Sequence, residues 1–87
     1  MAQTAMNTTI DLLYFARVAE LVGKRAEAWP LAADTTGERL LAELRAHYPR
    51  LAQAQRLRLA INQEHAAPAA RVQAGDEVAI FEPVTGG

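Results

Sequence analysis

Residues 35–48 carry the clearest secondary-structure signal in the sequence, an amphipathic helix. Thr35 and Glu38 have the S/T-x-x-E spacing of a capping box, in which each side chain can satisfy the other residue's free backbone N–H. Apolar residues then recur along one helical face, at Leu40, Leu41, Leu44 and Tyr48. Pro49 disfavours the helical conformation of the residue before it, so we expect the helix to end there. A helix with a single apolar stripe must cover another layer of the fold.

That other layer is predicted to be a β-sheet, because strand patterns lie on both sides of the helix. Residues 10–15, 24–31, 57–61 and 78–81 are apolar or alternate in polarity, and residues 65–70 could add a short irregular strand. Pro30 indicates that the strand at 24–31 lies at a sheet edge or ends there. Residues 16–22 have helical spacing and stop at Gly23, a favourable residue after a helix. One main helix across a mixed sheet of four or five strands is an α+β arrangement of the β-grasp, or ubiquitin-like, type.

A chain of 87 residues has room for one domain, and its composition argues against several classes of function. Nine basic residues against ten acidic ones leave no basic excess for nucleic acid, and no apolar run reaches the roughly 20 residues that cross a bilayer. The chain has no cysteine, and His47 and His65 lack the spacing of a metal site. No nucleophile–base pair or phosphate loop occurs, and residues 1–9 do not resemble a secretory signal. We therefore expect a cytoplasmic protein that binds no cofactor and is not an enzyme by itself.

The sequence ends in EPVTGG, directly after the last predicted strand. Glycines lack Cβ atoms, so they can thread a narrow channel and adopt dihedral angles closed to other residues. Fully extended, residues 82–87 would reach about 20 Å, and Pro83 stiffens their base. We expect a disordered lead-in at 1–8, a β-grasp domain at 9–81 and a flexible tail at 82–87. The working group would be the terminal carboxylate of Gly87, which needs activation, most simply as a mixed anhydride with AMP.

Several segments resemble the small subunits of molybdopterin synthase, a family of ubiquitin-like sulfur carriers. Residues 14–23 (YFARVAELVG) resemble the family signature F-F-A-x-x-x-E-L-x-G. Asn62-Gln63, the run GDEVAIF at residues 75–81 and the ending P-V-x-G-G resemble further family markers in matching order. The resemblance covers residues 10–87, which is nearly the whole domain.

The resemblance implies a sulfur carrier in molybdenum cofactor biosynthesis. A ubiquitin-activating-like adenylyltransferase would use ATP to adenylate Gly87, and a sulfurtransferase or cysteine desulfurase would supply the sulfur of a thiocarboxylate. The tail would then enter the large synthase subunit and give sulfur to cyclic pyranopterin monophosphate. Gly86, Thr85, Val84 and Pro83 would thread this partner's channel. The family's active form is a heterotetramer in which the small subunit is not catalytic alone.

Phe15 and Phe81 match family positions that pack on partner proteins. Phe15 falls on the strand face opposite Ile10 and Leu12, and exposed aromatic side chains are typical interface anchors. Two residues depart from the family pattern. Glu82 replaces the first proline of F-P-P-V-x-G-G, which should make the base of the tail less rigid, and His65 stands where an apolar residue of the partner surface is expected.

Three alternatives remain open at this point. Sulfur carriers of the thiamine pathway share the fold, but they are usually shorter and lack the helix at 16–22. A ubiquitin-like protein modifier would use the same acyl-adenylate to join Gly87 to lysines of target proteins. A plain interaction domain with an idle tail would keep its partner function after Gly87 is removed.

Overall fold

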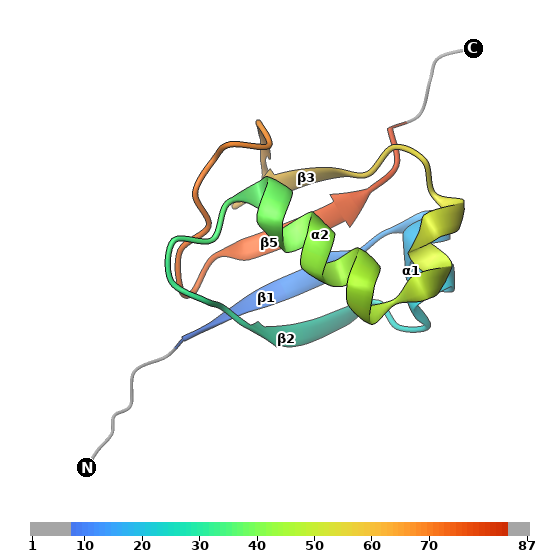
Figure 1. The fold of residues 1–87 in the computed structure, drawn as a ribbon, viewed down its shortest axis with the longest axis horizontal. Coiled ribbons are helices and arrows are strands. Elements are labelled where there is room, and N and C mark those ends of the chain that lie inside the picture. Colours follow the sequence, from blue (N-terminus) through green and yellow to red (C-terminus); the bar gives the residue numbers. More distant parts are fainter. Residues whose placement is uncertain (1–7, 84–87) are drawn as a thin grey trace.

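The computed structural model describes residues 8–83 of the chain. Its elements follow in the order β1 (Thr9–Tyr14), α1 (Ala16–Val22), β2 (Ala26–Pro30), α2 (Gly37–His47), the 3₁₀ helix η1 (Pro49–Gln53), β3 (Arg58–Ile61), β4 (Glu64–Ala66) and β5 (Glu77–Phe81), as Figure 1 shows. Both predicted helices and all four predicted strands are present. The possible fifth strand is the three-residue β4.

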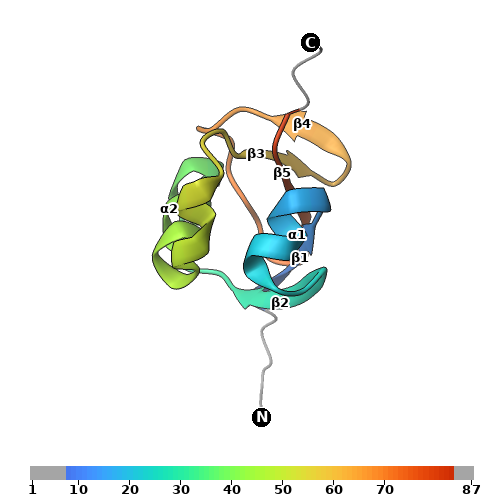
Figure 2. The same cartoon turned by 90° about the vertical axis from the view of Figure 1, so that its right-hand side faces the viewer.

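The five strands form one mixed sheet in the order β2-β1-β5-β3-β4. β1 and β5, from opposite ends of the described chain, pair in parallel, and the other neighbouring strands pair antiparallel. α2 lies across one face of the sheet, and α1 follows the end of β1 (Figures 1 and 2). β2 is an edge strand, which confirms the prediction made from its terminal Pro30. This is the predicted β-grasp arrangement.

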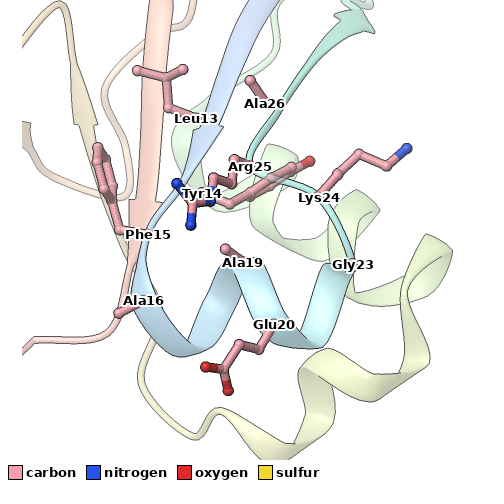
Figure 3. Close-up of a pocket in the computed structure, with 10 residues that line it drawn as sticks. All are labelled: Leu13, Tyr14, Phe15, Ala16, Ala19, Glu20, Gly23, Lys24, Arg25 and Ala26. Carbon is pink, nitrogen blue, oxygen red and sulfur yellow. The ribbon is translucent and has the colours of Figure 1, made fainter.

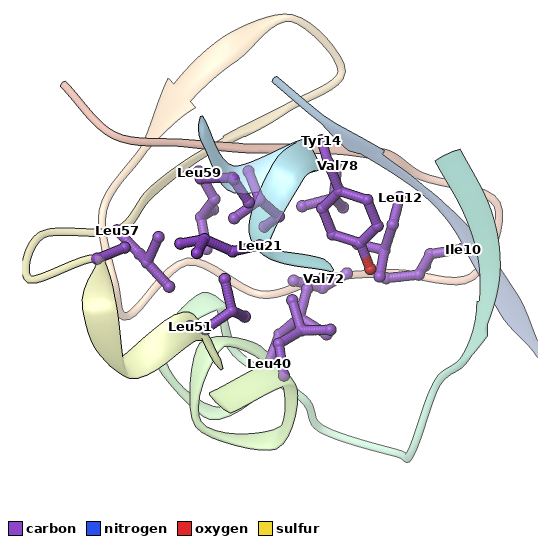
Figure 4. Packing of buried hydrophobic residues seen from close by; sticks show 14 residues of the cluster. Ile10, Leu12, Tyr14, Leu21, Leu40, Leu51, Leu57, Leu59, Val72 and Val78 are labelled. Carbon is purple, nitrogen blue, oxygen red and sulfur yellow. The ribbon is translucent and has the colours of Figure 1, made fainter. Parts of the chain in front are cut away.

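The hydrophobic core fills the space between the sheet and the helices (Figure 4). β1 alternates, so that Ile10, Leu12 and Tyr14 are buried on the face toward α2. From α2, Leu40 and Leu44 face the sheet with no exposed surface. Removing such side chains from water contributes roughly 1.5–3 kcal/mol each. The remaining buried apolar members of the cluster are Val18, Leu21, Leu51, Ala54, Leu57, Leu59, Val72, Val78 and Ile80.

The N-terminus of α2 differs from the predicted capping box of Thr35 and Glu38. The N-cap is Thr36, whose hydroxyl accepts a hydrogen bond from the backbone N–H of the residue three positions later at 3.2 Å. Thr35 is buried instead, and its hydroxyl donates to the Ala32 carbonyl at 2.7 Å. The backbone N–H of Glu38 donates to the Pro68 carbonyl at 2.8 Å. The prediction was wrong because either of two adjacent threonines can cap a helix, and contacts with distant loops selected the second.

The other predicted helix ends are confirmed. α2 ends at His47, just before Pro49, and Gly23 after α1 has a left-handed φ of +92°. The β3–β4 turn is made by Asn62 and Gln63, both with positive φ. Glu64 is the first residue of β4.

The expected lead-in and tail lie outside the described residues except at their inner ends. Thr8 is exposed, and its carbonyl accepts a hydrogen bond from the Leu31 N–H at 2.8 Å, beside the β1–β2 pair. At the other end, Glu82 and Pro83 follow β5 and are half-buried.

Candidate interaction surface and tail base

β5 carries the chain directly into the predicted tail. Val78 and Ile80 have no exposed surface and anchor the strand in the core, while Phe81 and Pro83 are half-buried. Of the predicted tail-threading residues, only Pro83 is described. Val84, Thr85, Gly86 and the predicted sulfur-bearing Gly87 lie outside the described residues. The tail therefore starts from the centre of the sheet, because β5 lies between β1 and β3.

One row of mainly small and apolar side chains crosses the sheet face opposite α2, beside the charged residues Asp11, Glu77 and Arg58 on the same face. The pairing registers align one row across all five strands: Ala26, Leu13, Ala79, Ala60 and His65. Leu13, Ala79 and Ala60, in the middle of this row, are only half-buried. We call this row with Phe15 and Phe81 the open face. No helix in residues 8–83 lies across it as α2 lies across the opposite face (Figure 2).

Phe15 and Phe81 lie at the tail end of the open face. Phe15 is 50% exposed, and it is the one large exposed hydrophobic side chain in the described part of the chain. Its backbone N–H donates to the Ile80 carbonyl at 3.3 Å, which places it next to β5, one residue past the paired Tyr14 and Ile80. The structure thus brings the two predicted interface residues to neighbouring positions.

His65, which departs from the family's apolar pattern, is part of the same surface. Its ring packs edge-on against the ring of Phe81, with centroids 5.4 Å apart. The aromatic ring therefore extends the open face while adding polar nitrogen atoms at its rim.

A hollow of about 730 Å³ adjoins Phe15 (Figure 3). It lies between α1 and the neighbouring ends of β1 and β2, and its lining includes the small residues Ala16, Ala19 and Gly23. Ala16 has a φ of +48°, which turns the chain sharply from β1 into α1. This turn leaves the Phe15 side chain at the surface.

A carboxylate and two tyrosines fix the strand ends behind this surface. Glu27 accepts hydrogen bonds from the hydroxyls of Tyr14 at 2.5 Å and Tyr48 at 2.6 Å, and Lys24 lies 3.3 Å away. Burial raises the pKa of the Tyr14 hydroxyl well above its usual range, and the Glu27 carboxylate raises it further. Burial also opposes ionisation of Glu27, but the hydrogen bonds from the tyrosines and Lys24 outweigh it and lower the pKa of this carboxyl. The group joins β1, β2 and the end of α2.

The base of the tail is held by an ion pair that the sequence patterns did not predict. Arg17 on α1 lies 3.6 Å from the Glu82 carboxylate and donates to the Gln53 carbonyl in η1 at 3.0 Å. These residues border a hollow of about 460 Å³ that also includes Arg56 and Pro83. Glu82 was identified as a departure from the family pattern, but its partner is too distant in sequence to be recognised from spacing.

Residues 8–83 contain no cluster of three or more metal-ligating side chains of the His, Cys, Asp or Glu type. None of the helices in this range has the length and apolar character needed to cross a membrane.

Fold and surface together define a ubiquitin-like β-grasp protein whose central strand runs into a Gly-Gly ending. The ThiS family pattern matches residues 12–87, and the chain belongs to the ThiS family. It is 36% identical over 81 residues to the molybdopterin synthase sulfur carrier subunit of Chlamydomonas reinhardtii, covering 90% of this chain and 98% of that one. It is 33% identical over 82 residues to the subunit of the same name from Caenorhabditis elegans, covering 91% and 98%.

A solved structure confirms the fold. SAMP1 from Haloferax volcanii matches with a TM-score of 0.76 and 30% identity, over 91% of this chain and 99% of that chain. The family resemblance recognised in the sequence is confirmed by these relatives.

Proposed function

We propose that this chain is the sulfur carrier of molybdopterin synthesis, with Gly87 as the sulfur-bearing residue. The observation that carries the proposal is its likeness to molybdopterin synthase sulfur carrier subunits over 98% of their length. The family match also extends to Gly87 itself. Relatives with this name favour the molybdopterin pathway over the thiamine pathway.

Charging of the carrier would take two steps. An oxygen of the Gly87 carboxylate attacks the α-phosphorus of ATP on a ubiquitin-activating-like adenylyltransferase, and pyrophosphate leaves. A sulfur nucleophile, hydrosulfide in the simplest case, then attacks the carbonyl carbon. The bond from this carbon to the AMP oxygen breaks, AMP leaves and a thiocarboxylate remains. In the cell, a sulfurtransferase or cysteine desulfurase would present the sulfur as a persulfide, from which a thiol would release the product.

Delivery would take place in the large subunit of molybdopterin synthase. The thiocarboxylate sulfur attacks an oxygen-bearing carbon of cyclic pyranopterin monophosphate, and the bond from that carbon to its oxygen breaks, the oxygen leaving with the electron pair. Water then cleaves the bond between this sulfur and the Gly87 carbonyl. The carboxylate of Gly87 is restored for another round, and two deliveries complete the dithiolene. The chain would thus act as a tethered co-substrate, and its tail would supply proximity rather than catalytic groups.

The open face would dock on these partners and aim the tail. The side chain of Phe15 is 50% exposed and could be buried by a partner, and Phe81 directly precedes the tail that would enter the partner. The small side chains of Ala79 and Ala60 would let a partner surface approach the sheet closely. Aromatic anchors beside a surface of small residues are typical of the centre of a protein interface.

The assembled enzyme would be a heterotetramer of large and small subunits. Pro83, Val84, Thr85 and Gly86 would lie in the large subunit's channel and hold Gly87 at the reaction centre. Dependence on ATP supports a cytoplasmic location for the charging step. The chain alone would bind no cofactor, and ATP would be bound by the activating enzyme.

Reconstitution with purified components would test this function. The chain is first charged with its adenylyltransferase, ATP and sulfide, then freed of small molecules and mixed with the large subunit and cyclic pyranopterin monophosphate. Charged chain should yield molybdopterin in proportion to the thiocarboxylate added, whereas uncharged chain and a variant lacking Gly87 should yield none. Product formation from the variant lacking Gly87 would contradict the proposal.

A second candidate function, protein modification, is favoured by the likeness to SAMP1 of Haloferax volcanii, whose name is small archaeal modifier protein 1. Lys24 is the only lysine in this chain, so side-chain linkage between copies could occur only there. Its ammonium lies 3.3 Å from Glu27, which favours the protonated, non-nucleophilic form. Digestion of a cell extract followed by mass spectrometry would decide this. Peptides in which Gly87 is joined to lysines of other proteins would support a modifier. If no such peptides are found, only the carrier function remains.

A further inference from the structure

We propose that Arg17 is a positioning residue for the tail, which it holds through the side chain of Glu82. The proposal deepens the carrier function described above and rests on it. Arg17 would set the direction in which the chain leaves β5 and thereby place the carboxylate of Gly87 for adenylation.

The geometry joins three segments at one guanidinium group. Arg17 comes from the first turn of α1, and its Nη1 lies 3.6 Å from Oε2 of Glu82, the residue directly after β5. Its Nη2 donates to the carbonyl of Gln53 in η1 at 3.0 Å. The second contact fixes the guanidinium against the body of the domain, so less side-chain freedom is lost when it also holds Glu82.

Glu82 is thereby restrained in both its backbone and its side chain. Pro83 follows it and biases the backbone of Glu82 toward extended conformations. This bias does not fix the direction in which Glu82 leaves the domain. The ion pair between the Glu82 side chain and Arg17 limits that direction. The glutamate that replaces a proline in the sequence pattern is therefore tied to α1 by its charge.

The expected effect is modest because both groups are partly exposed. The side chain of Arg17 is 51% exposed and that of Glu82 is 26% exposed. An ion pair of this exposure changes an equilibrium by up to about fivefold, and salt screens it. The effect should therefore be largest at low ionic strength and should disappear at high ionic strength.

The test combines NMR relaxation of the full-length chain with adenylation kinetics. Arg17→Ala and Glu82→Gln should each lower the backbone order parameters of residues 82–85 and raise the KM for the carrier by about two- to fivefold, with kcat unchanged. The double variant should be no worse than either single variant, because both remove the same interaction. Arg56→Ala, which removes a positive charge from the same hollow, is the matched control and should change neither quantity.

A proline at position 82 provides the rescue. In Glu82→Pro the ring should restrain the backbone without the ion pair, so adding Arg17→Ala should then have no further effect. Unchanged order parameters in Arg17→Ala would overturn the proposal, as would changed order parameters with an unchanged KM at low salt. If the wild-type chain is not adenylated at all, the carrier function fails, while the order parameters still decide whether Arg17 holds the tail.

Discussion

Truncation of Phe15 should weaken binding to the large synthase subunit far more than it weakens the fold. A phenylalanine side chain buries about 200 Å² when it is fully enclosed, and Phe15 is 50% exposed, which leaves about 100 Å² to be covered by a partner. At about 25 cal/mol per Å², this area is worth about 2.5 kcal/mol. Phe15→Ala should therefore raise the Kd by up to about seventyfold.

The assay is isothermal titration calorimetry of the full-length chain with the purified large subunit. The backbone hydrogen bonds of Phe15 do not involve its side chain, so the turn into α1 should survive the substitution. Leu41→Ala is the matched control, because Leu41 is a half-buried apolar residue on α2, on the opposite side of the sheet. This variant should lose stability to chemical denaturation while its Kd stays within about twofold of the wild type.

The reasoning is refuted if Phe15→Ala binds as tightly as the wild type. A large increase of Kd in Leu41→Ala, with Phe15→Ala unaffected, would place the interface on the helical side of the domain. Both results can be separated from misfolding, because the free energy of unfolding is measured on the same samples.

Three further predictions concern the stability of the domain and are checked by chemical denaturation. Glu27→Gln should lower the free energy of unfolding by about 1–2 kcal/mol at pH 7, because the charge-assisted hydrogen bonds from the hydroxyls of Tyr14 and Tyr48 become neutral ones. Burial raises the pKa of Glu27, but the hydrogen bonds outweigh it and lower this pKa overall. The stabilisation by ionised Glu27 is therefore present at neutral pH and is lost as the pH falls below the usual glutamate range. A stability difference between the wild type and Glu27→Gln that stays constant down to acid pH would contradict this. Gln63→Gly should raise the free energy of unfolding by roughly 0.5–1 kcal/mol, because a left-handed conformation strains a residue with a Cβ atom, and no gain would show that the turn is unstrained. Thr36→Ala should cost about 1 kcal/mol through loss of the helix cap, whereas an equal loss in Glu38→Ala would indicate that the capping box operates after all.

Sequence patterns were sufficient for the elements and the layers of this fold. Alternation in β1 separates Ile10 and Leu12, which face the core, from Phe15, which remains exposed, and this follows from the twofold period of a strand. The end of α2 follows from the steric effect of Pro49, and the left-handed Gly23 follows from the absence of a Cβ atom. These features depend on neighbours in the sequence.

Features that depend on distant partners were not predictable in the same way. Thr35 and Thr36 are equivalent as caps by spacing, and the carbonyl of Ala32 and the loop around Pro68 distinguish them only in the folded chain. By sequence alone, Glu27 cannot be distinguished from an ordinary surface carboxylate, because only the fold brings the hydroxyls of Tyr14 and Tyr48 to it. Arg17 and Glu82 likewise meet only because α1 packs beside the end of β5.

The most direct test of the central claim is the intact mass of the full-length chain after incubation with its adenylyltransferase, ATP and sulfide. The mass of the chain should rise by the difference between sulfur and oxygen, and this gain should depend on ATP and be absent from a variant lacking Gly87. An unchanged mass under conditions in which the adenylyltransferase releases pyrophosphate with this chain would contradict the claim, as would a gain that persists without Gly87.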